Sequence, residues 1–73
     1  MLDSLRGYII EPDAGILHAL KIIDLNRKGF LLVVRDNTFL GTLTDGDIRR
    51  AFICGKTSDM PITDIYISIG LIR

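Results

Sequence analysis

The chain has 73 residues, of which 48% are hydrophobic, and its nine basic and nine acidic residues give no net charge. This neutral balance lacks the basic footprint of a nucleic-acid-binding domain, and no apolar run is long enough to span a membrane. The single cysteine, Cys54, excludes an intramolecular disulfide, and the single histidine, His18, leaves no Cys/His set for zinc.

A domain this small buries only a modest core, so we expect a partner chain or a larger protein to support it. Residues 1–10 do not resemble a signal peptide, and a lone cysteine suits a reducing compartment, so we expect a cytoplasmic protein.

The first half of the domain is expected to be a strand followed by a helix. Residues 1–7 form a lead-in, and the apolar residues 8–10 predict a short strand. Pro12 sets up a turn, after which Asp13 can cap the N-terminus of a helix. Apolar residues recur at helical spacing over residues 14–27, which predicts that helix, and Gly29 is expected to terminate it.

A β-hairpin is expected next. The continuous apolar run at residues 30–34 is typical of a strand that is covered on both faces. Residues 35–37 favour a tight turn, and residues 39–43 return as the second strand. Gly41 inside that strand predicts a bend or the close approach of another group.

The last part of the chain is predicted to hold a second helix and an apolar tail. The helix begins near Thr44 and ends near Gly55, followed by a loop at 57–61 and a short element at 62–65. We expect the tail at 66–73 to be a cut linker or a partner-binding strand. The order strand–helix–strand–strand–helix predicts an α+β fold with a small mixed sheet and both helices on one face. The other face then needs a partner to cover it.

The sequence GTLTDGD at 41–47, followed by IRR, resembles the corresponding stretch of a CBS domain, the repeat named from cystathionine β-synthase. The order of elements, Pro12-Asp13 before the first helix and the buried strand at 30–34 add to this resemblance. It covers residues 8–65 and is strongest for the CBS repeats joined to sugar-nucleotidyltransferase domains, in which TDGDIRR follows the hairpin. The resemblance implies a single CBS repeat in this chain.

In that family two repeats pair, and the clefts between them bind AMP, ADP, ATP or S-adenosylmethionine to regulate an attached enzyme. The family pattern of a glycine, a Ser or Thr three residues later and an Asp three after that falls on Gly41, Thr44 and Asp47. By resemblance, Asp47 binds ribose hydroxyls, Thr44 lies near ribose or phosphate, and Val33 and Ile9 flank the base. Because only one repeat is present, a complete cleft needs a second copy of the chain or a second repeat.

The same residues have a structural explanation that needs no ligand. Thr44 and Asp47, spaced by three at a helix start, form a capping box. Two arginines, Arg49 and Arg50, are adjacent on this helix. Arg50 lies three residues beyond Asp47 on the same helix face, so of the two it is the better candidate for binding phosphate. A salt bridge with an aspartate explains it equally well. Asp45 and Asp47 lack the further oxygen ligands of a calcium loop, so we expect no metal site.

Two functions therefore remain in competition. The first is a regulatory module that pairs with another repeat and binds an adenine nucleotide or a related nucleotide metabolite. The second is a dimerisation or interaction domain that binds no small molecule. An enzyme is not expected, because the sequence has no nucleophile–base pair, no metal set and no glycine-rich phosphate loop. Any catalysis is expected in an attached domain, such as a nucleotidyltransferase.

Overall fold

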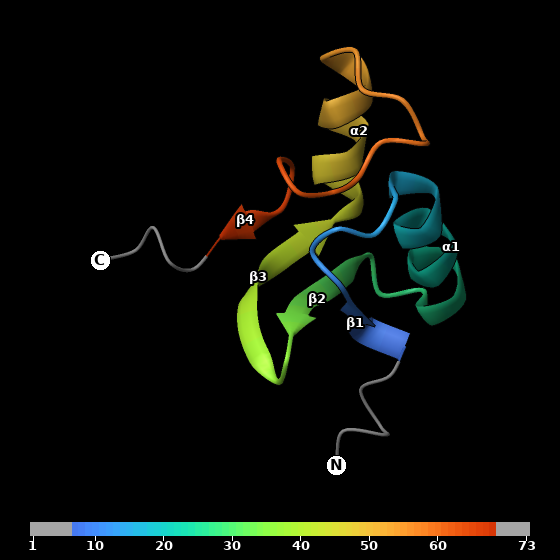
Figure 1. Cartoon of the computed structure of the whole chain (residues 1–73). Helices are drawn as coiled ribbons and strands as arrows, with labels where there is room; N and C mark the ends of the chain where they lie inside the picture. The colour runs from blue at the N-terminus through green and yellow to red at the C-terminus, as the bar shows by residue number, and fades with distance from the viewer. Residues whose placement is uncertain (1–6, 69–73) are drawn as a thin grey trace.

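The computed structural model describes residues 7–68 and shows a four-stranded sheet with two helices (Figure 1). The elements in chain order are β1 (Ile9–Ile10), α1 (Ile16–Asn26), β2 (Phe30–Arg35), β3 (Thr38–Thr44), α2 (Asp45–Ile53) and β4 (Ile67–Ser68). The sheet order is β1-β2-β3-β4, in which β1 is parallel to β2 and the other two pairs are antiparallel. The predicted α+β fold with a mixed sheet is therefore confirmed.

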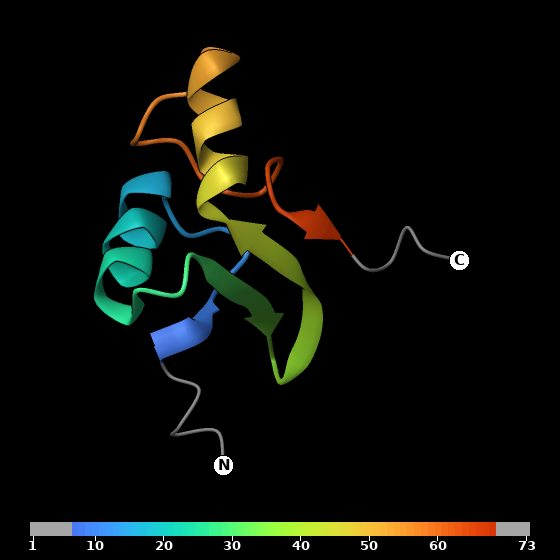
Figure 2. The same cartoon turned by 180° about the vertical axis from the view of Figure 1, so that it is seen from behind.

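The strand β4 was not predicted as part of this sheet. It lies beside β3 on the side of the molecule away from α1, as both views show (Figures 1 and 2). Residues 67 and 68 belong to the predicted apolar tail, and they pair with Thr42 and Gly41. The rest of that tail, residues 69–73, and residues 1–6 of the predicted lead-in lie outside the described residues. The short element expected at 62–65 is neither helix nor strand, but Ile62 is fully buried in the core.

Both helices pack into one hydrophobic core on the same face of the sheet. The core side chains come from both helices, three strands and the segment before β4: Ile10, Ile16, Ala19, Ile23, Leu31, Val33, Leu43, Ile48 and Ile62. The spacing of Ile16, Ala19 and Ile23 by three and four residues places them on one helix face, which explains why α1 packs there.

The start of α1 differs from the sequence prediction. Its N-cap is Gly15 rather than Asp13, and no side chain caps it. Two carbonyls from the loop before Ile62 accept the free N–H groups instead, with Met60 O at 2.8 Å from the nitrogen of Ile16. Asp13 forms an ion pair with Arg35 at 3.0 Å. The cap was mispredicted because its acceptors lie more than forty residues along the chain, where no local pattern reports them.

Residues with left-handed backbone dihedrals end helix α1 and form the turn between β2 and β3. Arg27, at φ 57°, is the C-cap, two residues before the expected terminator Gly29, which also has positive φ. Asp36 and Asn37 have φ values of 52° and 63°. Positive φ at both central residues of a two-residue loop is the type I′ hairpin turn, which matches the twist of the flanking strands. The predicted turn is therefore confirmed.

The second face of the sheet is apolar, and no helix of residues 7–68 covers it. Cross-strand partners share a face, so the pairs Ile9–Leu32 and Leu32–Thr42 lie opposite the core. We call this surface the open face; its large apolar side chains are Ile9, Phe30, Leu32, Val34, Phe39 and Ile67, with the ring of Tyr8 stacked on Phe30. The burial of β2 alternates along the strand, so the described residues cover it on one face only, whereas the sequence predicted cover on both faces.

Candidate functional site

The predicted capping box is present at the start of α2. Thr44 Oγ1 accepts a hydrogen bond from the backbone N–H of Asp47 at 3.1 Å. In return, Asp47 Oδ2 accepts from the backbone N–H of Thr44 at 2.9 Å. These two bonds satisfy donors that a helix N-terminus otherwise leaves free.

The other oxygen of the same carboxylate binds an arginine. Asp47 Oδ1 accepts from Nη2 of Arg50. The side chain of Asp47 is only 7% exposed, whereas that of Arg50 is 69% exposed. The structure therefore brings together Thr44, Asp47 and Arg50 as the sequence predicted. The neighbouring Arg49 is exposed and makes no ion pair within the described part of the chain.

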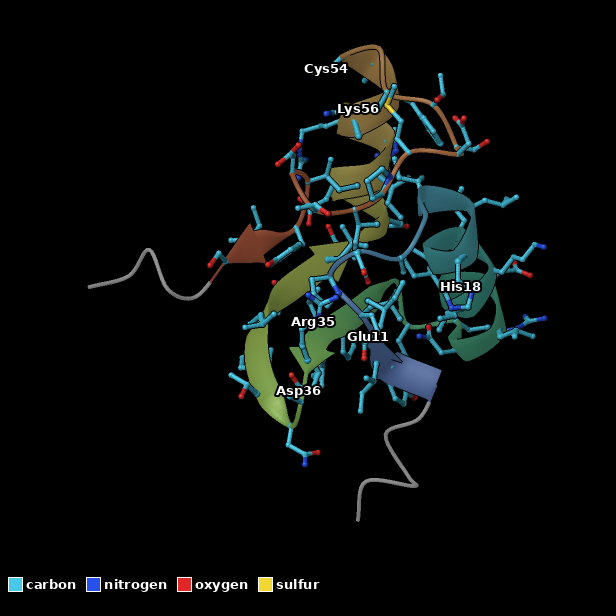
Figure 3. All side chains as sticks on the ribbon, viewed as in Figure 1. Glu11, His18, Arg35, Asp36, Cys54 and Lys56 are labelled. Carbon is cyan, nitrogen blue, oxygen red and sulfur yellow. The ribbon has the colours of Figure 1, made fainter. Side chains whose placement is uncertain are left out.

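A cleft of about 270 Å³ lies between α2 and the segment that leads into β4. We call it the α2 cleft; its lining residues are Asp47, Arg50, Ala51, Cys54, Lys56, Asp64, Ile65 and Ile67. Lys56 and Cys54 lie toward the far end of α2 (Figure 3). Ligand pockets usually enclose about 300–1,000 Å³, so this cleft has room for part of a nucleotide and would need a further wall to enclose the rest.

Gly41 lies beneath the backbone of β4. A Cβ atom at this position would be 2.0 Å from the carbonyl oxygen of Ile67, so only glycine fits. The predicted close approach is confirmed, and the approaching group is the backbone of this chain. Gly41 therefore positions Ile67, which lines the α2 cleft.

The two residues predicted to flank a base lie on opposite faces of the sheet. Val33 is 0% exposed and belongs to the core, so its side chain does not face the surface in this chain. Ile9 is half-buried on the open face, and its partner there is Leu32. The reason is the alternation of side chains along a strand, which puts Leu32 and Val34 on the face opposite Val33.

Sequence reasoning missed an apolar recess beside Ile9. This recess, about 260 Å³, is lined by Tyr8, Lys28, Phe30 and Leu32. The rings of Tyr8 and Phe30 stack with centroids 5.5 Å apart. Phe30 pairs with Thr44 in the sheet, so the recess adjoins the start of α2. The two-residue turn fixes the register of the hairpin. Deriving that register from the sequence would have placed Phe30 and Leu32 on the same face of the sheet.

A surface ion-pair cluster holds the turn between β1 and α1. Arg35 contacts Asp13 at 3.0 Å and Glu11 at 3.4 Å, and Figure 3 shows Glu11 beside Arg35. Asp13 and, less strongly, Glu11 raise the pKa of the Arg35 guanidinium. Because all three side chains are exposed, these ion pairs are expected to contribute little to stability.

Neither a metal cluster nor a membrane helix is found in the part of the chain that the structure describes. Residues 7–68 contain no group of three or more His, Cys, Asp or Glu side chains placed to hold a metal ion. Within the same range no helix has both the length and the apolar character needed to cross a membrane.

Several solved structures that share this fold are of proteins with CBS domains. One is a cystathionine beta-synthase domain protein fused to a Zn-ribbon-like domain, with a TM-score of 0.76 and 22% identity over 82% of this chain and 89% of that chain. A CBS domain protein from Pyrobaculum aerophilum, complexed with AMP, has a TM-score of 0.75 and 20% identity over 84% of this chain and 49% of that one. A protein with CBS domains from Burkholderia ambifaria has a TM-score of 0.79 and 25% identity, covering 90% and 51%.

This chain thus spans about half the length of the latter two proteins. No curated protein matches it. The family model of the CBS domain matches residues 7–54, which include β1 through α2 and the whole Thr44–Asp47–Arg50 cluster. With well over half of its residues matched by that model and its fold shared with these structures, the chain belongs to the CBS domain family.

Proposed function

We propose that this domain is a non-catalytic regulatory module that pairs with a second CBS repeat and binds an adenine nucleotide or a related nucleotide metabolite. The binding state would regulate an attached enzyme, for which a sugar nucleotidyltransferase is our candidate. The observation that carries the proposal is the nearly buried carboxylate of Asp47, which borders the α2 cleft beside an exposed arginine. CBS domains are commonly regulatory and nucleotide-binding, and the Pyrobaculum aerophilum protein was solved with AMP.

The chemistry of the cluster suits a ribonucleotide. A carboxylate accepts hydrogen bonds from both hydroxyls of a ribose diol, which is the role we propose for Asp47. Arg50 can donate two parallel hydrogen bonds to a phosphate, and Lys56 adds a second positive charge to the same cleft. Thr44 would lie near the ribose or phosphate. The rings of Tyr8 and Phe30 would offer a stacking surface for a base, together with Ile9 and Leu32.

The open face supports pairing with a second repeat. It carries several large apolar side chains in adjacent strands, including Phe30, Phe39 and Ile67, which remain exposed in this chain. Contiguous apolar patches of this kind mark interaction surfaces, because burying them removes apolar area from water. A second copy of this chain or a second repeat of a longer protein would supply the cover and the other wall of the α2 cleft.

A charge on the open face tests the pairing. Leu32→Asp is expected to convert a dimer into a folded monomer, because an aspartate in an apolar interface would be desolvated without a partner. Light scattering after size-exclusion chromatography measures the mass, and circular dichroism checks the fold. Leu25→Asp is the matched control, since Leu25 is 81% exposed on α1 and lies outside the open face. A monomeric wild-type chain, or a Leu32→Asp variant that stays dimeric, would contradict pairing of two copies through this face.

Ligand binding is tested by thermal unfolding of the chain with AMP, ADP, ATP, S-adenosylmethionine, CMP and UDP-sugars. A ligand present at about a hundred times its dissociation constant adds roughly 2.7 kcal/mol to the free energy of unfolding. For a domain of this size we expect the melting temperature to rise by roughly ten degrees or more. A rise with one nucleotide class identifies the chemistry of the site. No rise with any compound would contradict nucleotide binding by this chain.

The second candidate function is an interaction domain that binds no small molecule. The observation that favours it is the state of Asp47, both of whose oxygens already have partners within the chain. Under this alternative, Thr44 and Asp47 serve only as a capping box, and the Leu32→Asp result would be unchanged. The ligand panel therefore separates the two candidates.

A further inference from the structure

Both oxygens of the Asp47 carboxylate accept a hydrogen bond within this chain. Oδ2 accepts from the backbone of Thr44, a bond that also fixes the helix start. Oδ1 accepts from Arg50, whose side chain is largely exposed. Of these two bonds, the one to Arg50 can break without disturbing the helix. Because the side chain of Asp47 is only 7% exposed and Arg50 already binds Oδ1, a ligand hydroxyl that reaches this oxygen would meet the guanidinium there and compete with it for space.

We propose that Arg50 is an exchangeable counter-ion, which makes the binding of a diol at Asp47 depend on an anionic group in the same ligand. This inference rests on the proposed nucleotide function and deepens it. On binding, the guanidinium leaves Oδ1, a ligand hydroxyl takes its place, and Arg50 moves to the phosphate. No bond other than hydrogen bonds is made or broken.

The charges at the site explain why the exchange depends on a phosphate. Asp47 is nearly buried, and its ion pair with Arg50 is a charge-assisted hydrogen bond. A neutral nucleoside would replace that bond with a weaker one and leave the guanidinium without an anion. A nucleotide supplies hydroxyls to Asp47 and a phosphate to Arg50, so both charges keep a partner.

The surroundings of Arg50 favour this exchange. Its guanidinium lies against Gly46, where a Cβ atom would be 3.6 Å from Nη1, and no other carboxylate pairs with it among residues 7–68. Asp64 lines the same cleft as a second carboxylate, and Lys56 lines it as a second cation, so an anion in the cleft has two cationic side chains to bind. The site would therefore discriminate nucleotides from nucleosides through Arg50, which pairs with Asp47 in the free chain and with the phosphate in the complex.

The test is calorimetric titration of the full chain with nucleotide–nucleoside pairs: AMP with adenosine, CMP with cytidine, GMP with guanosine and UMP with uridine. For the pair that binds, Arg50→Ala is expected to weaken nucleotide binding by roughly tenfold or more. The same variant is expected to tighten nucleoside binding by roughly two- to fivefold, because Asp47 is no longer occupied. Arg49→Ala is the matched control, and it should leave both affinities unchanged.

The nucleoside result separates exchange from simple phosphate binding. If Arg50→Ala weakens the nucleotide but leaves nucleoside affinity unchanged, Arg50 only binds phosphate and the exchange is wrong, while the proposed function stands. The same holds if the variant changes neither affinity. If wild type and Arg50→Ala bind no nucleotide and no nucleoside, nucleotide binding itself is wrong and the exchange falls with it.

Discussion

Replacing Asp47 with alanine is expected to abolish nucleotide binding and to lower the free energy of unfolding by about 1–3 kcal/mol. The loss of stability follows from the capping box: without the carboxylate, the backbone N–H of Thr44 loses its acceptor at a partly buried site. Arg50 loses its partner as well, but it is largely exposed, so this contributes little. Urea denaturation measures the stability, and calorimetric titration measures the binding.

Two further variants separate the cap from the ligand site. Asp47→Asn keeps an oxygen that can accept from the N–H of Thr44, so most of the stability should remain, while the negative charge for Arg50 and the ligand is lost. Asp45→Asn removes an exposed carboxylate two residues earlier in the same helical turn and should retain binding. Nucleotide binding by Asp47→Asn at wild-type affinity would show that the carboxylate serves only as a cap.

The cluster at the start of α2 could be predicted from sequence because its geometry is local. Residues three apart on a helix face each other, so Thr44, Asp47 and Arg50 meet whatever the rest of the fold does. The hairpin turn was predictable for the same reason, since Asp36 and Asn37 favour positive φ. Local spacing was also sufficient for the order of the first five elements.

Features that depend on distant segments could not be predicted. The run at 30–34 is apolar throughout, so only the register with β1 and β3 decides that Val33 enters the core and Leu32 the open face. The N-terminus of α1 is capped by carbonyls of Ser58 and Met60, which no pattern near Asp13 indicates. Gly41 indicated that another group approaches β3 closely, but the sequence did not indicate that this group is the backbone of Ile67.

Gly41→Ala is expected to detach β4 from β3 and to lower the free energy of unfolding by about 1–3 kcal/mol. The added methyl would lie 2.0 Å from the carbonyl oxygen of Ile67 and 3.0 Å from the Cα atom of Ser68. Because these are backbone atoms, no rotamer change relieves the clash, and the strand itself must move. Hydrogen exchange of the amides at 41–42 and 67–68 measures the detachment.

The consequence for function follows from what β4 holds in place. Ile67 lines the α2 cleft, so Gly41→Ala should also weaken ligand binding although it leaves the Thr44–Asp47–Arg50 cluster untouched. Gly46→Ala is the matched control for stability: its Cβ would meet only ordinary contacts, the nearest at 3.6 Å, and alanine favours the helix, so we expect a change between zero and about 1 kcal/mol more stable. If Gly41→Ala had the same melting temperature as the wild type and its amides at 41–42 and 67–68 kept their protection from hydrogen exchange, the close approach of β4 to β3 would be wrong. The family's glycine at this position would then need a different explanation, such as direct contact with a ligand.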